Sequence, residues 1–402
     1  MIGRRELFGA AAATVALGKT LQSEVAKAAT PAQAADAMQK LVTVQPRGAD
    51  GRLLRLGTLD LESQQDFTAG FRKMHAKQIR AASLNAFDRL LEAEGIDPAT
   101  ALSVDQVRKL IVKDPAINIA SKTWLANQQI TWKTLYDHFH DNADRYLGEM
   151  ELADKAGPGA LRLSPAMAIP DYTRHEIHIQ PGGYVGDPFA GHMYHYGTNS
   201  FYMGSRGHNE QDEIHRGVAS RMPLPEDGKV RRILDMGCGI GQMTVALKER
   251  FPEAEVWGID VGAPMLRYAH LRAARLGVGA NFAQQLAEQT GFPDGHFDIV
   301  ASYIIHHELP AEITRQVIAE AHRVTRAGGV FYPLDFDTGG VKQPARAMYG
   351  RWWDHRWNNE VWSLEYHGMN FSEEIAQRGF TPVKNGTAVL PGFGARHFVR
   401  AA

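Results

Sequence analysis

A glycine-rich turn between an apolar run and an amphipathic segment constrains the fold of this chain most strongly. The run Val230–Asp235 has the composition of a buried strand and leads into the turn Asp235-Met236-Gly237-Cys238-Gly239-Ile240-Gly241. The next residues have helical spacing, with Met243, Ala246 and Leu247 on one side. Glycines at such a turn let a ligand approach the backbone, and the start of the helix favours polar or anionic groups.

A second apolar run, residues 255–259, ends at Asp260, about 20 residues after the last loop glycine. An acidic residue at that spacing can accept hydrogen bonds from both hydroxyls of a ribose. Position 242 is Gln, so the turn lacks the G-x-G-x-x-G spacing of dinucleotide sites, which disfavours a nicotinamide cofactor. From Lys229 onward, strand-like and helix-like segments alternate, as is typical of an α/β sheet.

The turn at 235–241 resembles that of the class I S-adenosylmethionine-dependent methyltransferases. Further segments follow in that family's order, namely Pro264–Leu266, Phe292–Val300, His306–Pro310 and Arg323–Gly329. The third of these is similar to the corresponding segment of the ubiquinone-methylase-like branch. The resemblance covers about Lys229–Asp337, with a weaker tail from Phe371. It implies the α/β fold class: a Rossmann-like, seven-stranded methyltransferase sheet, here with an N-terminal helical cap domain.

The resemblance implies S-adenosyl-L-methionine as the cofactor. Asp235 and the loop glycines would position the methionine part, and Asp260 the ribose. Leu286 stands where the family commonly has an acidic residue near the adenine amine. Either backbone groups and apolar contacts hold the adenine instead, or the cofactor binds weakly. The expected cofactor-binding residues are Asp235, Gly237, Gly239, Gly241, Asp260, Val261, Leu286, Ala287 and Tyr303.

Methyl transfer is an in-line displacement, so the protein mainly supplies alignment, together with a general base where the nucleophile is weakly acidic. Ligands of open α/β sheets lie beyond the carboxyl ends of the strands, so the segments after the fourth and fifth strands should line the pocket. His306 and His307 are therefore candidates for the base, although either can instead be structural. Asp335 is expected on the substrate side.

An aromatic insertion, residues 338–368, separates the fifth strand from the last helix. Its aromatic side chains can roof an apolar pocket or pack as core. The first alternative makes an apolar or aromatic acceptor the better expectation. The candidate substrate-binding residues in this insertion are Trp352, Trp353 and Trp357.

The chain holds 17 histidines but one cysteine, Cys238, which we interpret as a small filler in the loop. Two pairs, His175-x-x-His178 and His192-x-x-His195, invite a metal hypothesis. Residues three apart on a strand point to opposite faces, and a site without cysteine also needs carboxylates. Candidates for these are Asp187, Glu308 and Asp335. We predict no metal, and interpret the histidines as part of a polar connector packed at the pocket mouth.

The chain before the sheet divides into two regions. Residues 31–155 are predicted to form a helical domain, with a capping box at Ser103 and Gln106 opening one of its helices. Residues 156–228 are predicted to be a Gly/Pro/His-rich connector on the substrate side, with one short strand near 174–180. Residues 229–402 are then the methyltransferase domain.

The first 30 residues have the pattern of an export signal. Arg4 and Arg5 precede two hydrophobic residues and a short alanine-rich run, which resembles a twin-arginine signal. This run is shorter than the roughly 20 apolar residues that span a bilayer, so we expect no stable membrane insertion. We expect a periplasmic or exported protein, the alternative being a flexible helix on a cytoplasmic one.

Charge and motifs together lead to two functional interpretations. Lys plus Arg is 44 and Asp plus Glu is 45, for a net charge of −1, so the chain has no general attraction for nucleic acid or an anionic membrane. The first interpretation is a methyltransferase acting on a C or O nucleophile of a small apolar or aromatic acceptor. The alternative is an exported, non-catalytic protein that binds an adenosyl ligand and retains the fold.

Overall fold

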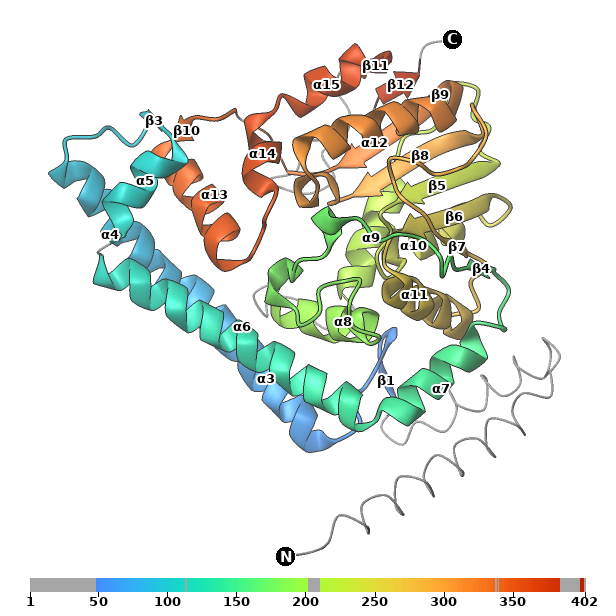
Figure 1. Ribbon diagram of the computed structural model, residues 1–402, viewed down its shortest axis with the longest axis horizontal. Helices are drawn as coiled ribbons and strands as arrows, with labels where there is room; N and C mark the ends of the chain where they lie inside the picture. The colour runs from blue at the N-terminus through green and yellow to red at the C-terminus, as the bar shows by residue number, and fades with distance from the viewer. Residues whose placement is uncertain are drawn as a thin grey trace, which may run out of the picture.

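The computed structural model describes residues 48–112, 114–201, 210–336, 338, 340–383 and 398–400. The predicted export signal lies outside these residues. The described chain forms a sheet flanked by helices and, beside it, a lobe of long N-terminal helices (Figure 1). We call this part, residues 59–153, the helical lobe.

Eight strands form the central sheet. Their order across the sheet is β11 (Phe380–Pro382), β12 (Phe398–Arg400), β9 (Thr325–Leu334), β8 (Phe297–Tyr303), β5 (Arg232–Met236), β6 (Glu255–Asp260), β7 (Asn281–Gln284) and β4 (Leu161–Arg162). The strands from β9 to β4 are parallel, whereas β12 runs antiparallel to both of its neighbours, β9 and the edge strand β11. The predicted α/β methyltransferase fold is confirmed, and the connector adds the edge strand β4.

Alternate residues of the strands face helices on opposite sides of the sheet. On one side, Leu234 and Phe331 pack with apolar residues of α12 (Ala311–Val324) and α15 (Phe371–Gln377). On the other side, Ile233 and Val330 pack against α9 (Glu210–Arg221) and α10 (Gln242–Arg250). The helix α11 (Ala263–Arg275) covers β6 and β7. Both faces are buried, which explains the continuous apolar runs of the parallel strands.

The helical lobe consists of helices that bury apolar stripes against one another. Its elements are α3 (Leu59–Met74), the π-helical turn η1 (His75–Ile79), α4 (Arg80–Ala93), α5 (Val104–Ile111), α6 (Pro115–Asp141) and α7 (Ala143–Ala153), preceded by the strand pair β1 (Ala49–Asp50) and β2 (Leu53–Leu54). The predicted capping box is confirmed: Ser103 Oγ accepts from the Gln106 N–H at 3.3 Å, and Gln106 Oε1 accepts from the Ser103 N–H at 2.9 Å. A helix both long and apolar enough to cross a bilayer does not occur among the described residues.

The connector does not contain the strand predicted near residues 174–180. Two 3₁₀ turns occupy this region, η2 (Asp171–Thr173) and η3 (Ile177–Ile179). The backbone N–H groups of Ile179 and Gln180 bond within the turn, to the carbonyls of Glu176 and Ile177, so no neighbouring strand is needed to satisfy them. The helix α8 (Ala190–Phe201) follows and packs between α6 and α11.

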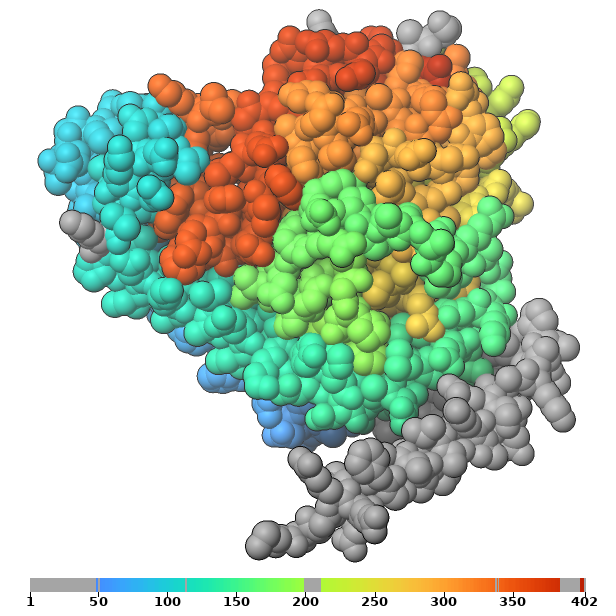
Figure 2. Space-filling model, in the orientation of Figure 1, coloured from blue at the N-terminus to red at the C-terminus, as the bar shows by residue number. Residues whose placement is uncertain are grey.

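The aromatic insertion returns to the helical lobe. Its elements are β10 (Gln343–Pro344), α13 (Ala345–Trp357) and α14 (Ser363–Gly368), and β10 pairs with β3 (Ala101–Leu102). Tyr349 of α13 stacks on Phe87 of α4 with ring centroids 4.8 Å apart. Figure 2 shows the insertion between the helical lobe and the sheet, so that residues distant in sequence close one side of the molecule.

The packing of α8 on α6 gives a test of the fold. A Cβ added at Gly197 would lie 1.9 Å from Cζ3 of Trp132, a rigid buried ring. We expect Gly197→Ala to lower the free energy of unfolding by about 3 kcal/mol, measured by chemical denaturation.

The matched control is Gly148→Ala in α7, where an added Cβ meets nothing within 4 Å. This variant should be unchanged or more stable by about 0.5–1 kcal/mol, because alanine favours helix. Equal stability of the two variants would contradict the packing of α8 on Trp132.

Candidate functional site

A cavity of about 610 Å³ lies at the carboxyl ends of the central strands. Its wall includes residues from the ends of β5, β6 and β8, from the connector, from the helical lobe and from the insertion. Such a position is the usual ligand site of an open α/β sheet. All of the predicted cofactor-binding residues except Gly241 line this cavity, namely Asp235, Gly237, Gly239, Asp260, Val261, Leu286, Ala287 and Tyr303.

The glycine loop has a backbone conformation that residues with a side chain rarely adopt. Gly237, Gly239 and Gly241 all have positive φ, at 68°, 51° and 71°. A Cβ at Gly237 would lie 2.2 Å from Ile305, and a Cβ at Gly241 2.6 Å from Phe282. Gly241 therefore closes the turn against the core, whereas Gly237 and Gly239 present backbone to the cavity.

Asp260 fixes the loop to the neighbouring strand. Its Oδ2 accepts a hydrogen bond from the Gly239 N–H at 2.9 Å, and its Oδ1 accepts from the Gly262 N–H at 2.8 Å. Each carboxylate oxygen has more than one acceptor site, so both can still accept from a ligand hydroxyl. Burial raises the pKa of Asp260, and this effect outweighs the backbone hydrogen bonds, which by themselves lower it.

Asp235 is completely buried at the end of β5. Its Oδ2 accepts from the Thr244 hydroxyl at 2.6 Å, whereas its Oδ1 has no hydrogen-bond partner among the described residues. Burial raises the pKa of Asp235 to about 7, and the charge of Asp260 adds to this shift. An unpaired buried oxygen at the cavity wall is suited to a donor group on a ligand.

The end of β7 supplies an acceptor that the sequence analysis missed. Leu286 and Ala287 line the cavity as predicted, and neither has an acidic side chain. The preceding residue, Gln285, also lines it, and its Oε1 is buried without a hydrogen-bond partner among the described residues. An amide oxygen can accept from an amine much as a carboxylate does. The only available sequence signal was its position next to Leu286.

The two base candidates point in different directions from the short turn η4 (His306–Glu308). His307 lines the cavity, but His306 does not. The His306 Nε2 lies 3.0 Å from Ser302 Oγ, and its ring packs on Phe371 with centroids 4.6 Å apart. Burial lowers the pKa of His306 to about 4. His306 is therefore a buried structural residue, and its predicted role as a base is not supported by its position.

Asp335 lies behind His307 and not at the cavity wall, where it was predicted. Its Oδ1 lies 2.7 Å from Nδ1 of His307, and its Oδ2 accepts from the His306 N–H at 2.7 Å. Burial by itself lowers the pKa of His307, but the carboxylates of Asp335, Glu308 and Glu360 outweigh it and together raise this pKa to about 10. His307 is thus an imidazolium at neutral pH, which makes it a hydrogen-bond donor to an anion rather than a base.

Of the three predicted substrate tryptophans, Trp353 alone lines the cavity. It packs edge-on to Trp124 at 4.7 Å and donates to Ser121 Oγ at 3.1 Å. Trp352 and Trp353 both pack against the apolar core that α4, α5 and α13 share, and Trp357 lies beneath the Lys122 ammonium at 4.5 Å. Neighbouring residues of a helix face different directions, so one of the three tryptophans faces the cavity.

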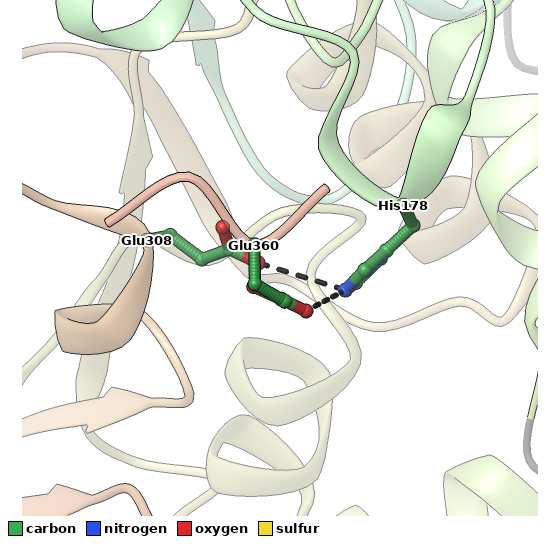
Figure 3. A group of neighbouring side chains, drawn as sticks. All are labelled: His178, Glu308 and Glu360. Carbon is green, nitrogen blue, oxygen red and sulfur yellow. Dashed lines mark hydrogen bonds and ion pairs between the residues drawn. The ribbon is translucent and has the colours of Figure 1, made fainter. Parts of the chain in front are cut away.

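The two histidine pairs of the connector lie in different surroundings. His192 and His195 are buried in a cluster of aromatic rings, where His195 Nδ1 lies 2.7 Å from the Tyr268 hydroxyl. His178 lines the cavity and lies near two glutamates, Glu308 of η4 and Glu360 of the insertion (Figure 3). Of these three residues, Glu360 was not considered in the sequence analysis.

The comparisons with known proteins agree with this geometry. Residues 233–329 match the methyltransferase domain family. This match bears out the family resemblance for these residues, which are about a quarter of the chain.

Relatives with known names match this region as well. The chain is 36% identical over 107 residues to a demethylmenaquinone methyltransferase of Thermus thermophilus, covering 26% of this chain and 47% of that protein. It is 34% identical over 100 residues to the ubiquinone biosynthesis O-methyltransferase of Pseudomonas aeruginosa, covering 25% and 41%. The chain thus spans less than half the length of these relatives.

Solved structures show more distant likeness. A Pyrococcus horikoshii protein has 17% identity and a TM-score of 0.38, over 50% of this chain and 94% of that one. The magnesium protoporphyrin IX methyltransferase of Synechocystis has 18% identity and a TM-score of 0.33, over 48% and 81%.

The buried Asp235 predicts a pH dependence of stability. Its pKa is raised in the folded protein from about 3.9 in the unfolded chain to about 7, so folding favours the protonated form. Its contribution is fully present below about pH 4 and is lost as the pH rises through 7. We expect Asp235→Asn, which cannot ionise, to gain stability relative to wild type by up to about 4 kcal/mol between pH 4 and 8.

Denaturant titrations at several pH values measure this difference. Thr244→Val serves as the control, because it removes the hydroxyl bonded to Asp235 while the carboxyl group remains titratable. A difference between Asp235→Asn and wild type that stays constant with pH would contradict the raised pKa.

Proposed function

We propose that the chain is an S-adenosylmethionine-dependent methyltransferase that acts on a C or O nucleophile of a small apolar or aromatic acceptor. The observation that carries this proposal is the glycine loop, with Asp235 and Asp260 at one wall of a cavity built by a methyltransferase domain. Bound cofactor supplies an activated methyl group, and the protein's own residues bind, align and shield the two reactants.

The cofactor would lie along the ends of β5, β6 and β7. Asp260 retains free lone pairs for the ribose hydroxyls, and Asp235 Oδ1 is free to accept from a donor on the methionine part. Gln285 Oε1 would accept from the adenine amine, and Leu286 would pack on the ring. This arrangement replaces the acidic residue that the family commonly has there.

The acceptor would lie between His307 and the aromatic side chains of the connector and the insertion. Tyr172, Tyr184, Phe336 and Trp353 line this part of the cavity. The names of the relatives, which refer to demethylmenaquinone and ubiquinone biosynthesis, favour a ring with an oxygen substituent. The His307 imidazolium, held by Asp335, would donate to that oxygen and stabilise its anion as the methyl group is transferred.

The ribose assignment predicts the effect of Asp260→Ala. Titration calorimetry with S-adenosylhomocysteine should show at least a 100-fold loss of affinity, because two hydroxyls lose a charged acceptor. The matched control is Asp298→Asn, which changes a buried carboxylate at the opposite end of the sheet that accepts from the Arg231 and Arg232 N–H groups. This control should retain binding.

If wild type does not bind S-adenosylhomocysteine, the cofactor assignment is wrong. Mass spectrometry of ligands that co-purify with the chain would also identify a different cofactor. The alternative, a non-catalytic adenosyl-ligand-binding protein, is distinguished by turnover: it would bind S-adenosylhomocysteine but form none from S-adenosylmethionine with any phenolic or enolic acceptor.

We also propose that the first 30 residues direct export through the twin-arginine route. The support is the paired Arg4 and Arg5 ahead of a short apolar run. Cell fractionation should find wild type in the periplasm and the Arg4→Lys/Arg5→Lys double variant in the cytoplasm. Cytoplasmic protein in both cases would refute the signal.

A further inference from the structure

Three residues from distant parts of the chain converge at the cavity wall. His178 comes from the connector, Glu308 from the turn after β8, and Glu360 from the insertion (Figure 3). The His178 Nε2 lies 2.7 Å from Glu360 Oε1 and 3.6 Å from Glu308 Oε1. One nitrogen and two carboxylate oxygens all lie within 4.8 Å of one another.

The two carboxylates have too few partners for their burial. The Glu360 side chain is 8% exposed and that of Glu308 12%. Among the described residues, the Oε2 atoms of Glu308 and Glu360 accept no hydrogen bond. Glu360 Oε1 accepts from Asn358 Nδ2 at 3.2 Å, and His178 Nε2 contacts both carboxylates. The His307 imidazolium, 3.7 and 3.9 Å from them, is shared with Asp335, so one positive charge faces three buried carboxylates. Burying two carboxylates side by side is costly unless a cation compensates them.

The surrounding backbone is strained in support of this arrangement. The non-glycine residues with positive φ in the described ranges are His178, Ile179, Ile304 and Asn359. The first is a member of the cluster, the second follows it, Ile304 lines the cavity, and Asn359 precedes Glu360. Such conformations cost about 1–3 kcal/mol each and collect at functional sites. They are least expected for β-branched residues such as Ile179 and Ile304.

We propose that His178, Glu308 and Glu360 bind a divalent transition-metal ion at the wall of the cavity. Oxygen and nitrogen ligands of such an ion lie about 2.0–2.2 Å from it, so neighbouring ligands are about 3–3.5 Å apart. The distances from His178 Nε2 approach that spacing, and small side-chain rotations complete it. One imidazole with two carboxylates suits Zn²⁺ or Mn²⁺ better than Mg²⁺ or Ca²⁺.

The second nitrogen of His178 is already oriented. Its Nδ1 lies 3.0 Å from the Tyr184 hydroxyl. A ligating histidine needs such an outer partner to hold the ring. Binding through Nε2 places the imidazole proton on Nδ1, where the Tyr184 oxygen can accept it, so the proton balance closes without another group.

With three protein ligands that line the cavity, the ion would have a further coordination position for a small molecule bound there. Rings with an oxygen substituent would place that oxygen on the ion, which would lower the pKa of a phenol or enol and favour its anion. This role at the acceptor rests on the proposed methyl transfer, whereas binding of the ion does not. The acceptor class becomes a phenol or enol able to coordinate a metal.

The test is calorimetry of the full chain, stripped with chelator, with Zn²⁺ and separately with Mn²⁺. Wild type should bind a single ion per chain. Glu308→Gln and Glu360→Gln should each lose at least tenfold in affinity, and so should His178→Asn, in which asparagine tolerates the positive φ. His175→Gln and Glu365→Gln change similar groups outside the cluster and should bind as wild type.

The variants also bind S-adenosylhomocysteine if they are folded, which separates loss of the metal site from loss of structure. Failure of wild type to bind either ion, or equal binding by all variants, would overturn the site. If wild type binds the ion but does not bind S-adenosylhomocysteine, the proposed methyl transfer is overturned and the proposed metal site remains.

A chromogenic catechol tests the open position. The visible absorbance of 4-nitrocatechol measures its ionisation, and so its apparent pKa. With Zn²⁺ present, this pKa should be lower in the presence of the wild-type chain than in the presence of the Glu360→Gln chain. The same ionisation pH for both chains would overturn contact between the ion and an acceptor oxygen.

Discussion

The hydrogen bonds from the Gly239 and Gly262 N–H groups to Asp260 are the constraint on which the site depends. They tie the loop after β5 to the end of β6, so that two successive strands present their backbone to the same cavity. The loop can turn this sharply because its glycines have positive φ. Asp235, beneath the loop, is thereby buried with one oxygen unpaired. Backbone shape and local charge are thus set together, before any ligand arrives.

This part of the molecule could be predicted from sequence because its information is local. Glycine spacing, the apolar run before it and the acidic residue after β6 all lie within about 30 residues, the length of one strand–helix–strand unit. The capping box at Ser103 was predictable for the same reason. The prediction of a strand near residues 174–180 was wrong, because alternation of apolar and polar residues does not reveal whether a partner strand is available.

The acceptor side could be predicted only in part, because it is assembled from distant segments. Adjacent histidines 306 and 307 look equivalent in sequence, yet one packs on Phe371 and the other faces the cavity. Glu360 carries no local motif, and its place beside His178 is set by the return of the insertion to the helical lobe. Trp352, Trp353 and Trp357 were all predicted to bind substrate, but the direction of each side chain depends on which helices α13 contacts.

The stacking of Tyr349 on Phe87 affects how the cavity can open. Helix α13 shares one apolar core with α4 and α5, so the roof of the cavity is not an independent flap. Opening it fully would expose that core, and amide protons of α5 and α13 should then exchange with solvent as one cooperative unit. Entry and exit of small molecules would therefore require partial unfolding of this shared core. Helices α5 and α13, which lie more than 200 residues apart in the chain, would open together.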